Sequence, residues 1–235
     1  MEFKGLLPLS LIEYPGKNVA VVHTGGCDFR CHFCYNRDLV LNPGALPSIS
    51  EQEVLDLLAR RKKWLDGLAI TGGEPTMHTD LPKFIERVKA LGSLVLLETN
   101  GSNPEMLEDL INRKLVDYVA LDVKAPLEWE RYREVARIED RAIFEKVLRS
   151  IELLKRSEVD YEFRTTFAPG LLSSDDIVAI AEQLEGAKRY ALQQFVPRST
   201  VDEKFESAKP AGRGELEKLG EEIKDKFQKF ELRNI

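Results

Sequence analysis

Three cysteines within eight residues are the feature of this 235-residue sequence that points most directly to chemistry. Cys27, Cys31 and Cys34 follow a C-x3-C-x2-C spacing, and the chain contains no other cysteine. An odd, crowded set cannot form a complete internal disulfide framework, so a reducing compartment and a metal-type role fit better. Three thiolates at this spacing can fold round one face of a [4Fe-4S] cluster. Such a cluster ordinarily takes four cysteines, so three would leave one iron open to a small molecule.

Structural zinc and a purely structural cluster are the alternatives for these cysteines. Zinc needs four ligands, so His32 or His23 would have to complete the set. His32 lies between two of the cysteines, where binding the same ion is awkward. A purely structural cluster would need a fourth cysteine, which the chain lacks. These considerations favour a cluster with one open iron.

Polar motifs lie at or directly after the ends of predicted strands. Thr71-Gly72-Gly73-Glu74-Pro75 contains two glycines that let the backbone approach a ligand closely, and Glu74 can accept from an ammonium group. Glu98-Thr99-Asn100-Gly101 follows the next strand, and Asp122 and Lys124 end the one after it. Their charges could hold ribose hydroxyls or a carboxylate. The structural alternatives are a plain Gly-Pro turn and solvated loop charges.

Three further positions are weaker candidates for the same site. Arg164 ends the fifth predicted strand and could pair with a carboxylate in a bidentate manner, although a surface ion pair is the simpler interpretation. Gln193 and Gln194 lie on the last predicted strand, where alternation lets only one of them face inward, and we assign Gln194 to the site. His78 follows the Gly-Gly motif and is more typical of a loop histidine than of a catalyst.

The elements that must position these residues alternate between strands and helices. A capping box at Ser50 and Glu53 predicts the start of the first long helix, and Asn103 followed by Pro104 predicts the start of another. Alternating units imply a mainly parallel sheet of the α/β class, and six of them make a partial (β/α)6 TIM-like barrel with its site at the carboxyl ends of the strands. The predicted strands are 17–24, 68–71, 93–98, 116–123, 161–166 and 189–196.

We expect a single domain over residues 1–235. Its barrel core would span 17–197, after an N-terminal segment 1–16 that leads into the first strand. A C-terminal extension, 198–235, would carry an amphipathic helix from 215 to 230, because apolar residues recur there at helical spacing.

Composition excludes several classes of function. The net charge of −6 argues against a protein that coats nucleic acid. No run of 18 apolar residues is present, so we expect no membrane span, and residues 1–11 lack the pattern of a signal peptide. We therefore expect a cytoplasmic location.

The cysteine loop resembles the signature of the radical S-adenosylmethionine (SAM) superfamily, C-x3-C-x-aromatic-C, with Phe33 as the aromatic residue. The Gly72-Gly73-Glu74-Pro75 motif resembles the superfamily's GGEP, whose backbone and glutamate meet the methionine amino group of SAM. The resemblance implies that the open iron chelates SAM. The reduced cluster then cleaves SAM to methionine and a 5'-deoxyadenosyl radical, which abstracts hydrogen from a substrate.

Four segments resemble activating enzymes for glycyl radical proteins: 10–16 (SLIEYPG), 36–38 (NRD), 103–126 and 164–172 (RTTFAPGLL). The last two are most similar to the branch named anaerobic ribonucleoside-triphosphate reductase activating protein. That resemblance implies a glycyl radical enzyme as partner and an external electron donor, by family analogy a flavodoxin or ferredoxin. Tyr35 stands where these activases often carry histidine, and Glu98 where many carry aspartate.

Two other functions stay open from the sequence. The Glu98-Thr99-Asn100-Gly101 motif also resembles 7-carboxy-7-deazaguanine synthases, which rearrange a small tetrahydropterin and bind magnesium in the site. A non-catalytic iron–sulfur scaffold or electron carrier is the alternative from a different class. The GGEP-like motif with Asp122 and Lys124 argues against a carrier, since a carrier needs no SAM pocket.

Overall fold

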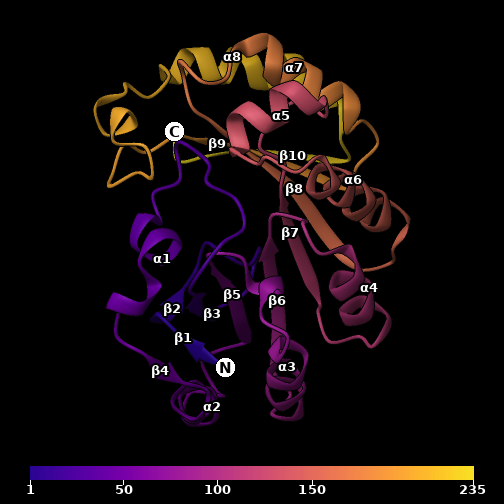
Figure 1. The fold of residues 1–235 in the computed structure, drawn as a ribbon. Helices are drawn as coiled ribbons and strands as arrows, with labels where there is room; N and C mark the ends of the chain where they lie inside the picture. Colours follow the sequence, from indigo (N-terminus) through magenta and orange to yellow (C-terminus); the bar gives the residue numbers. More distant parts are fainter.

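An eight-stranded sheet curves through the computed structural model, which describes residues 1–235 (Figure 1). The strand order is β10-β9-β8-β7-β6-β5-β3-β2, and every neighbouring pair is parallel except β2 with β3. The strands are β2 (Gly5–Ser10), β3 (Val19–Thr24), β5 (Gly67–Gly72), β6 (Leu94–Thr99), β7 (Tyr118–Asp122), β8 (Asp160–Phe167), β9 (Arg189–Gln194) and β10 (Lys229–Arg233). β1 (Glu2–Phe3) and β4 (Ile49–Ser50) form a separate antiparallel pair.

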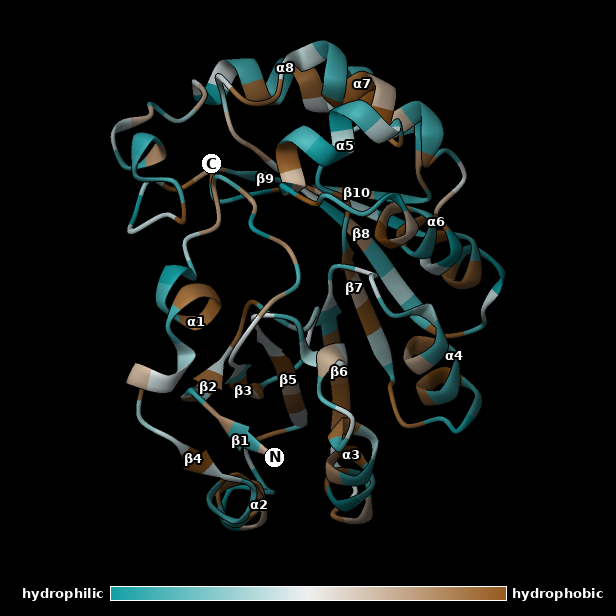
Figure 2. Ribbon diagram, viewed as in Figure 1, coloured by the Kyte–Doolittle hydropathy of each residue, from teal (hydrophilic) through white to brown (hydrophobic).

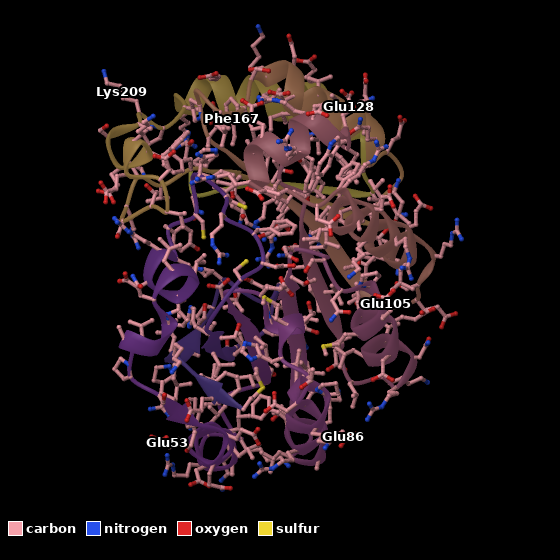
Figure 3. All side chains as sticks on the ribbon, viewed as in Figure 1. Glu53, Glu86, Glu105, Glu128, Phe167 and Lys209 are labelled. Carbon is pink, nitrogen blue, oxygen red and sulfur yellow. The ribbon has the colours of Figure 1, made fainter.

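Except for α1, the helices lie along the outer side of this curved sheet, and α3, α4 and α6 follow one another around it (Figure 1). Their polar faces point to solvent, as the outward side chains of Glu53, Glu86 and Glu105 show (Figure 3). The helices are α1 (Arg37–Leu41), α2 (Glu51–Arg60), α3 (Leu81–Ala90), α4 (Pro104–Asn112), α5 (Trp129–Ala136), α6 (Arg141–Arg156), α7 (Ser174–Gln183) and α8 (Arg213–Ile223).

Local sequence explains where the helices begin. The capping box of α2 is present: the Ser50 hydroxyl accepts from the Glu53 backbone N–H, and the Glu53 carboxylate accepts from the Ser50 N–H at 2.8 Å. The Asn103 side chain caps α4, whose first residue is Pro104. These caps satisfy backbone donors that the first helical turn leaves free.

The two faces of the sheet have different compositions. The outer face and the helices share one apolar core of 53 buried residues. The inner face carries a smaller apolar cluster, which we call the inner cluster. It consists of Tyr14, from the segment before β3, and of residues in the first halves of the strands: Val19, Val21, Ala69, Leu96, Tyr118 and Ala120. Because side chains alternate along a strand, the next inward positions are Thr71 after Ala69, Glu98 after Leu96 and Asp122 after Ala120. The inner face therefore changes from apolar to polar toward the carboxyl ends of the strands.

The predicted α/β class, mainly parallel sheet and partial barrel are confirmed. Two of the eight strands were not predicted. β2 extends the sheet beyond β3 as an antiparallel edge, and β10 extends it beyond β9.

The helix predicted over 215–230 is wrong in its second half, because α8 ends at Ile223. Phe227 keeps the helical spacing but lies beyond a turn, where its ring stacks on Tyr190 with centroids 4.6 Å apart.

No helix of the protein combines the length and the apolar character needed to cross a membrane.

Candidate functional site

One cavity of about 640 Å³ is lined by every residue that the sequence assigns to the site, from Cys27 through Gln194. It lies where the strands of the barrel end, and its volume is within the range of small-molecule sites. The structure thus brings the cysteine loop and the motifs that follow β5, β6, β7 and β8 together. The individual roles of these residues stay predictions.

The three cysteines are free thiols that face this cavity. The Cys27 Sγ accepts from the Phe29 backbone N–H at 3.4 Å and from the Asn100 Nδ2 at 3.8 Å, as metal-bound thiolates commonly do. His32, inside the loop, pairs its Nδ1 with the Asp202 carboxylate at 2.7 Å. The pairing fixes the orientation of the His32 ring through Nδ1 and leaves Nε2 unpaired.

The cysteines fit a cluster better than a single ion. No group of three or more His, Cys, Asp or Glu side chains is arranged to hold one metal ion. In a cubane cluster each cysteine binds a different iron, so the three sulfur atoms need not converge on one point. Burial raises the pKa of the Cys27 and Cys34 thiols, and raises the pKa of Cys31 to about 12. Binding iron would therefore release protons from all three thiols.

The Gly-Gly motif packs its backbone directly on the cysteine loop. The Gly73 N–H donates to the Thr24 carbonyl at 2.9 Å, and the Glu74 N–H donates to the Gly26 carbonyl at 2.8 Å. A Cβ atom at position 73 would overlap the Gly26 carbonyl, so only glycine fits there. Gly72 has φ +117°, a conformation that side chains disfavour.

Glu74 lies in the cavity wall with 1% of its surface exposed. Its carboxylate accepts from the backbone and hydroxyl of Thr76, from the Thr99 hydroxyl and from the Asn100 backbone N–H. Burial raises the pKa of Glu74 to about 7, although these donors act in the opposite direction.

Lys124 stands beside the cysteines. Its Nζ donates to the Asp122 carboxylate at 2.7 Å and lies 5.9 Å from the centroid of the Phe33 ring. Burial alone would lower the pKa of Lys124, but the charges of Asp122 and Cys31 outweigh burial and raise it. Lys124 therefore stays a cation next to the proposed cluster.

A row of alternating charges, which we call the charge row, crosses the inner face from β6 to β10. Arg164 donates from Nη1 to Glu98 at 2.6 Å and from Nε to Glu162. Glu162 is fully buried and receives two parallel bonds of 2.7 Å from Arg233, while Arg233 also reaches Glu231 at 2.9 Å. Figure 2 shows β8 as mainly hydrophilic beside the more hydrophobic β6 and β7.

The charge row fixes the ionisation of its members. Burial opposes ionisation of Glu98, but the Arg164 charge and the Thr71 hydroxyl outweigh burial and lower its pKa. Burial likewise opposes ionisation of Glu162, yet Arg164 and Arg233 lower its pKa to about 2. Three of the five N–H donors of Arg164 are engaged, to Glu162, Glu98 and the Glu13 carbonyl, which leaves two for a ligand.

Sequence reasoning missed several residues that line the cavity or support it. Glu13 lines it from the segment between β2 and β3, and Arg233 lines it from β10. Tyr35 lines it with 59% of its surface exposed. Glu162 could have been found from its spacing, because it lies two residues before Arg164 on one strand and so shares its face. Of the two glutamines on β9, Gln193 rather than the assigned Gln194 shares the inner face with Arg164, and both line the cavity. The Gln194 amide pairs with both backbone groups of Ala211.

A family model described as the Radical SAM superfamily matches residues 21–184. A Methanocaldococcus jannaschii protein, provisionally described as a glycyl-radical enzyme activating enzyme, is 35% identical over 98% of this chain and 95% of its own length. A 7-carboxy-7-deazaguanine synthase of Halobacterium salinarum is 34% identical over 34% of this chain and 31% of its own.

Among solved structures, SuiB of Streptococcus suis bound to S-adenosylmethionine aligns with a TM-score of 0.68 and 13% identity. The alignment covers 92% of this chain and 52% of SuiB, so this chain spans about half the length of that relative. At this identity the similarity concerns the fold alone.

Proposed function

The chain belongs to the radical SAM superfamily, and we propose that it uses SAM to place a glycyl radical on a partner enzyme. The cofactors of the family are a [4Fe-4S] cluster and SAM. The observation that carries the proposal is the similarity to the M. jannaschii protein, which extends over nearly the full length of both chains.

When both cofactors are bound, the reduced cluster supplies the electron that cleaves SAM to methionine and a 5'-deoxyadenosyl radical. Cys27, Cys31 and Cys34 would hold three of the four irons. The close approach of the Gly73 backbone to the cysteine loop leaves peptide groups, rather than side chains, at the cavity wall. Lys124, just after β7, and the two free N–H donors of Arg164, on the neighbouring β8, would attract a carboxylate.

The proposed substrate is a glycine residue of a large partner, such as an anaerobic ribonucleoside-triphosphate reductase. Transfer of one hydrogen atom from its α-carbon would give 5'-deoxyadenosine and a glycyl radical. Ile12 and Tyr35 line the cavity yet stay 77% and 59% exposed, as side chains at a mouth open to a macromolecule would be. The electron would come from an external carrier, which we propose is a flavodoxin or a ferredoxin.

The proposal is tested with anaerobically reconstituted protein, a reductant, SAM and a candidate glycyl radical enzyme encoded beside it. We expect 5'-deoxyadenosine in the mixture and a glycyl radical signal in electron paramagnetic resonance (EPR). Cys27→Ala protein should give neither product. Formation of 5'-deoxyadenosine without a radical on any such partner would refute the activase assignment. Absence of 5'-deoxyadenosine would instead support a non-catalytic scaffold.

A second candidate is a reaction like that of 7-carboxy-7-deazaguanine synthase. The local similarity to the Halobacterium protein favours it, as does the resemblance of Glu98-Thr99-Asn100-Gly101 to a motif of these synthases. The same reconstituted protein would be incubated with a carboxylated tetrahydropterin and magnesium. A deazaguanine product detected by mass spectrometry would select this candidate over the activase.

A further inference from the structure

The Glu74 side chain hydrogen-bonds to two loops of the cavity, its own loop after β5 and the loop after β6. Its Oε1 accepts from the Thr76 N–H at 3.0 Å, the Thr76 hydroxyl at 2.6 Å and the Thr99 hydroxyl at 2.7 Å, and its Oε2 accepts from the Asn100 N–H at 2.7 Å. Protein donors thus hold both oxygens of the carboxylate, three of them on Oε1 and one on Oε2. Only 1% of the residue is exposed.

The bond to Asn100 continues to a cysteine of the cluster loop. The Asn100 Nδ2 donates to the Asp28 carboxylate at 2.8 Å and lies 3.8 Å from the Cys27 Sγ. Its Oδ1 accepts from the Ser102 N–H at 2.9 Å, which fixes the orientation of the amide. Asn100 is therefore held at its backbone by Glu74 and presents its amide N–H to Cys27.

The backbone of Glu74 reaches the same loop by a second route. Its N–H donates to the Gly26 carbonyl, directly before Cys27, at 2.8 Å. The side chain of Glu74 thus extends to the loop after β6, while its main chain extends to the loop after β3. The position of the Asn100 amide relative to Cys27 depends on both connections.

We propose that Glu74 is also a positioning residue, which aligns the Asn100 amide with Cys27. The expected consequence concerns the cluster itself. A hydrogen bond to a ligating sulfur stabilises the thiolate, so loss of this alignment should make the cluster easier to remove. The inference rests on the family's cluster at the cysteines and is independent of which molecule donates hydrogen.

The test uses Glu74→Gln, which keeps the size of the side chain. Thr76 N–H and Asn100 N–H bind opposite oxygens of Glu74, so either orientation of the glutamine amide leaves one backbone N–H facing an NH2 group. Because an unsatisfied buried donor is costly, we expect the melting temperature of the cluster-free protein to fall by about 5 °C. We also expect a chelator to remove iron about tenfold faster from reconstituted Glu74→Gln protein than from reconstituted wild type, both without SAM.

Asn100→Ala provides the second variant, because it removes the amide and leaves the backbone bond to Glu74 in place. We expect it to accelerate iron loss as Glu74→Gln does, with a smaller change in melting temperature. The double variant should lose iron no faster than either single variant, since both act on one connection. The rate of iron loss from Asn100→Ala can be measured even if Glu74→Gln fails to fold.

Two outcomes would overturn the proposal. In the first, Glu74→Gln keeps the wild-type melting temperature and rate of iron loss but weakens SAM binding, as expected for an ammonium ligand. In the second, the effects of Glu74→Gln and Asn100→Ala on iron loss add independently, which would show that Glu74 does not act through Asn100.

Discussion

Glu162→Gln tests the charge row directly, because glutamine keeps the shape of Glu162 and removes its charge. Glu162 is fully buried, and the charges of Arg164 and Arg233 lower its pKa from an ordinary 4.5 to about 2. At 1.36 kcal/mol per pKa unit, this difference corresponds to about 3 kcal/mol of folding free energy at pH 7. Removal of one partner from a buried pair typically costs about 3–5 kcal/mol, which agrees with that figure.

The pH dependence gives the sharper test. Since the folded pKa of Glu162 lies below its unfolded value, its contribution to stability is complete above about pH 4.5 and is lost as the pH falls toward 2. Wild type and Glu162→Gln should therefore differ by about 3 kcal/mol at pH 7, and their difference should shrink between pH 5 and pH 3. Urea unfolding of the cluster-free proteins, followed by circular dichroism, measures both quantities.

Glu217→Gln on α8 is the matched control. Glu217 pairs with Arg213 at 2.8 Å, but the two side chains are 50% and 71% exposed. We expect this substitution to cost less than about 1 kcal/mol at pH 7, because solvent screens exposed pairs. A Glu162→Gln cost as small as this, or one that stays constant between pH 7 and pH 3, would contradict the pairing that we describe.

Three further predictions concern other parts of the site and fold. Cys34→Ser should bind less iron per chain after reconstitution and lose the visible absorption of the cluster; wild-type iron content would refute its role as a ligand. Gly73→Ala should destabilise the protein in thermal unfolding, because its Cβ would overlap the Gly26 carbonyl, whereas Gly44→Ala, with open space around it, should not. Asn103→Ala should cost about 1 kcal/mol in urea unfolding through loss of the α4 cap, and an unchanged midpoint would argue against that cap.

The sequence predicted the six central strands, and the first four of them are short apolar or β-branched runs followed by a polar motif. It did not predict β2, whose sequence GLLPLS contains Pro8 and exposes Leu7 and Leu9 instead of alternating. It also missed β10, because Phe227 continues the helical spacing of α8 even though the helix ends at Ile223. In both cases tertiary pairing with an existing strand, rather than local pattern, decides the structure.

A site residue could be predicted from the sequence where it ends or directly follows an apolar run that marks a strand. Asp122 and Lys124 each follow a clear apolar run, so their place at a strand end could be inferred. Arg233 could not be, since its role depends on a bidentate bond to Glu162, which lies 71 residues away in the sequence. Side-chain pairs between distant strands leave no periodic pattern in either segment.

The inner cluster beneath the cavity has a consequence for the timing of turnover. Side chains such as Val21, Ala69 and Leu96 close the barrel below the polar positions, so small molecules exchange on the side where the loops lie. Under the proposed function, a large partner docked on that side would also retain methionine and 5'-deoxyadenosine until it leaves. Each docking event would then deliver one radical, and the residence time of the partner would limit the rate of repeated activation.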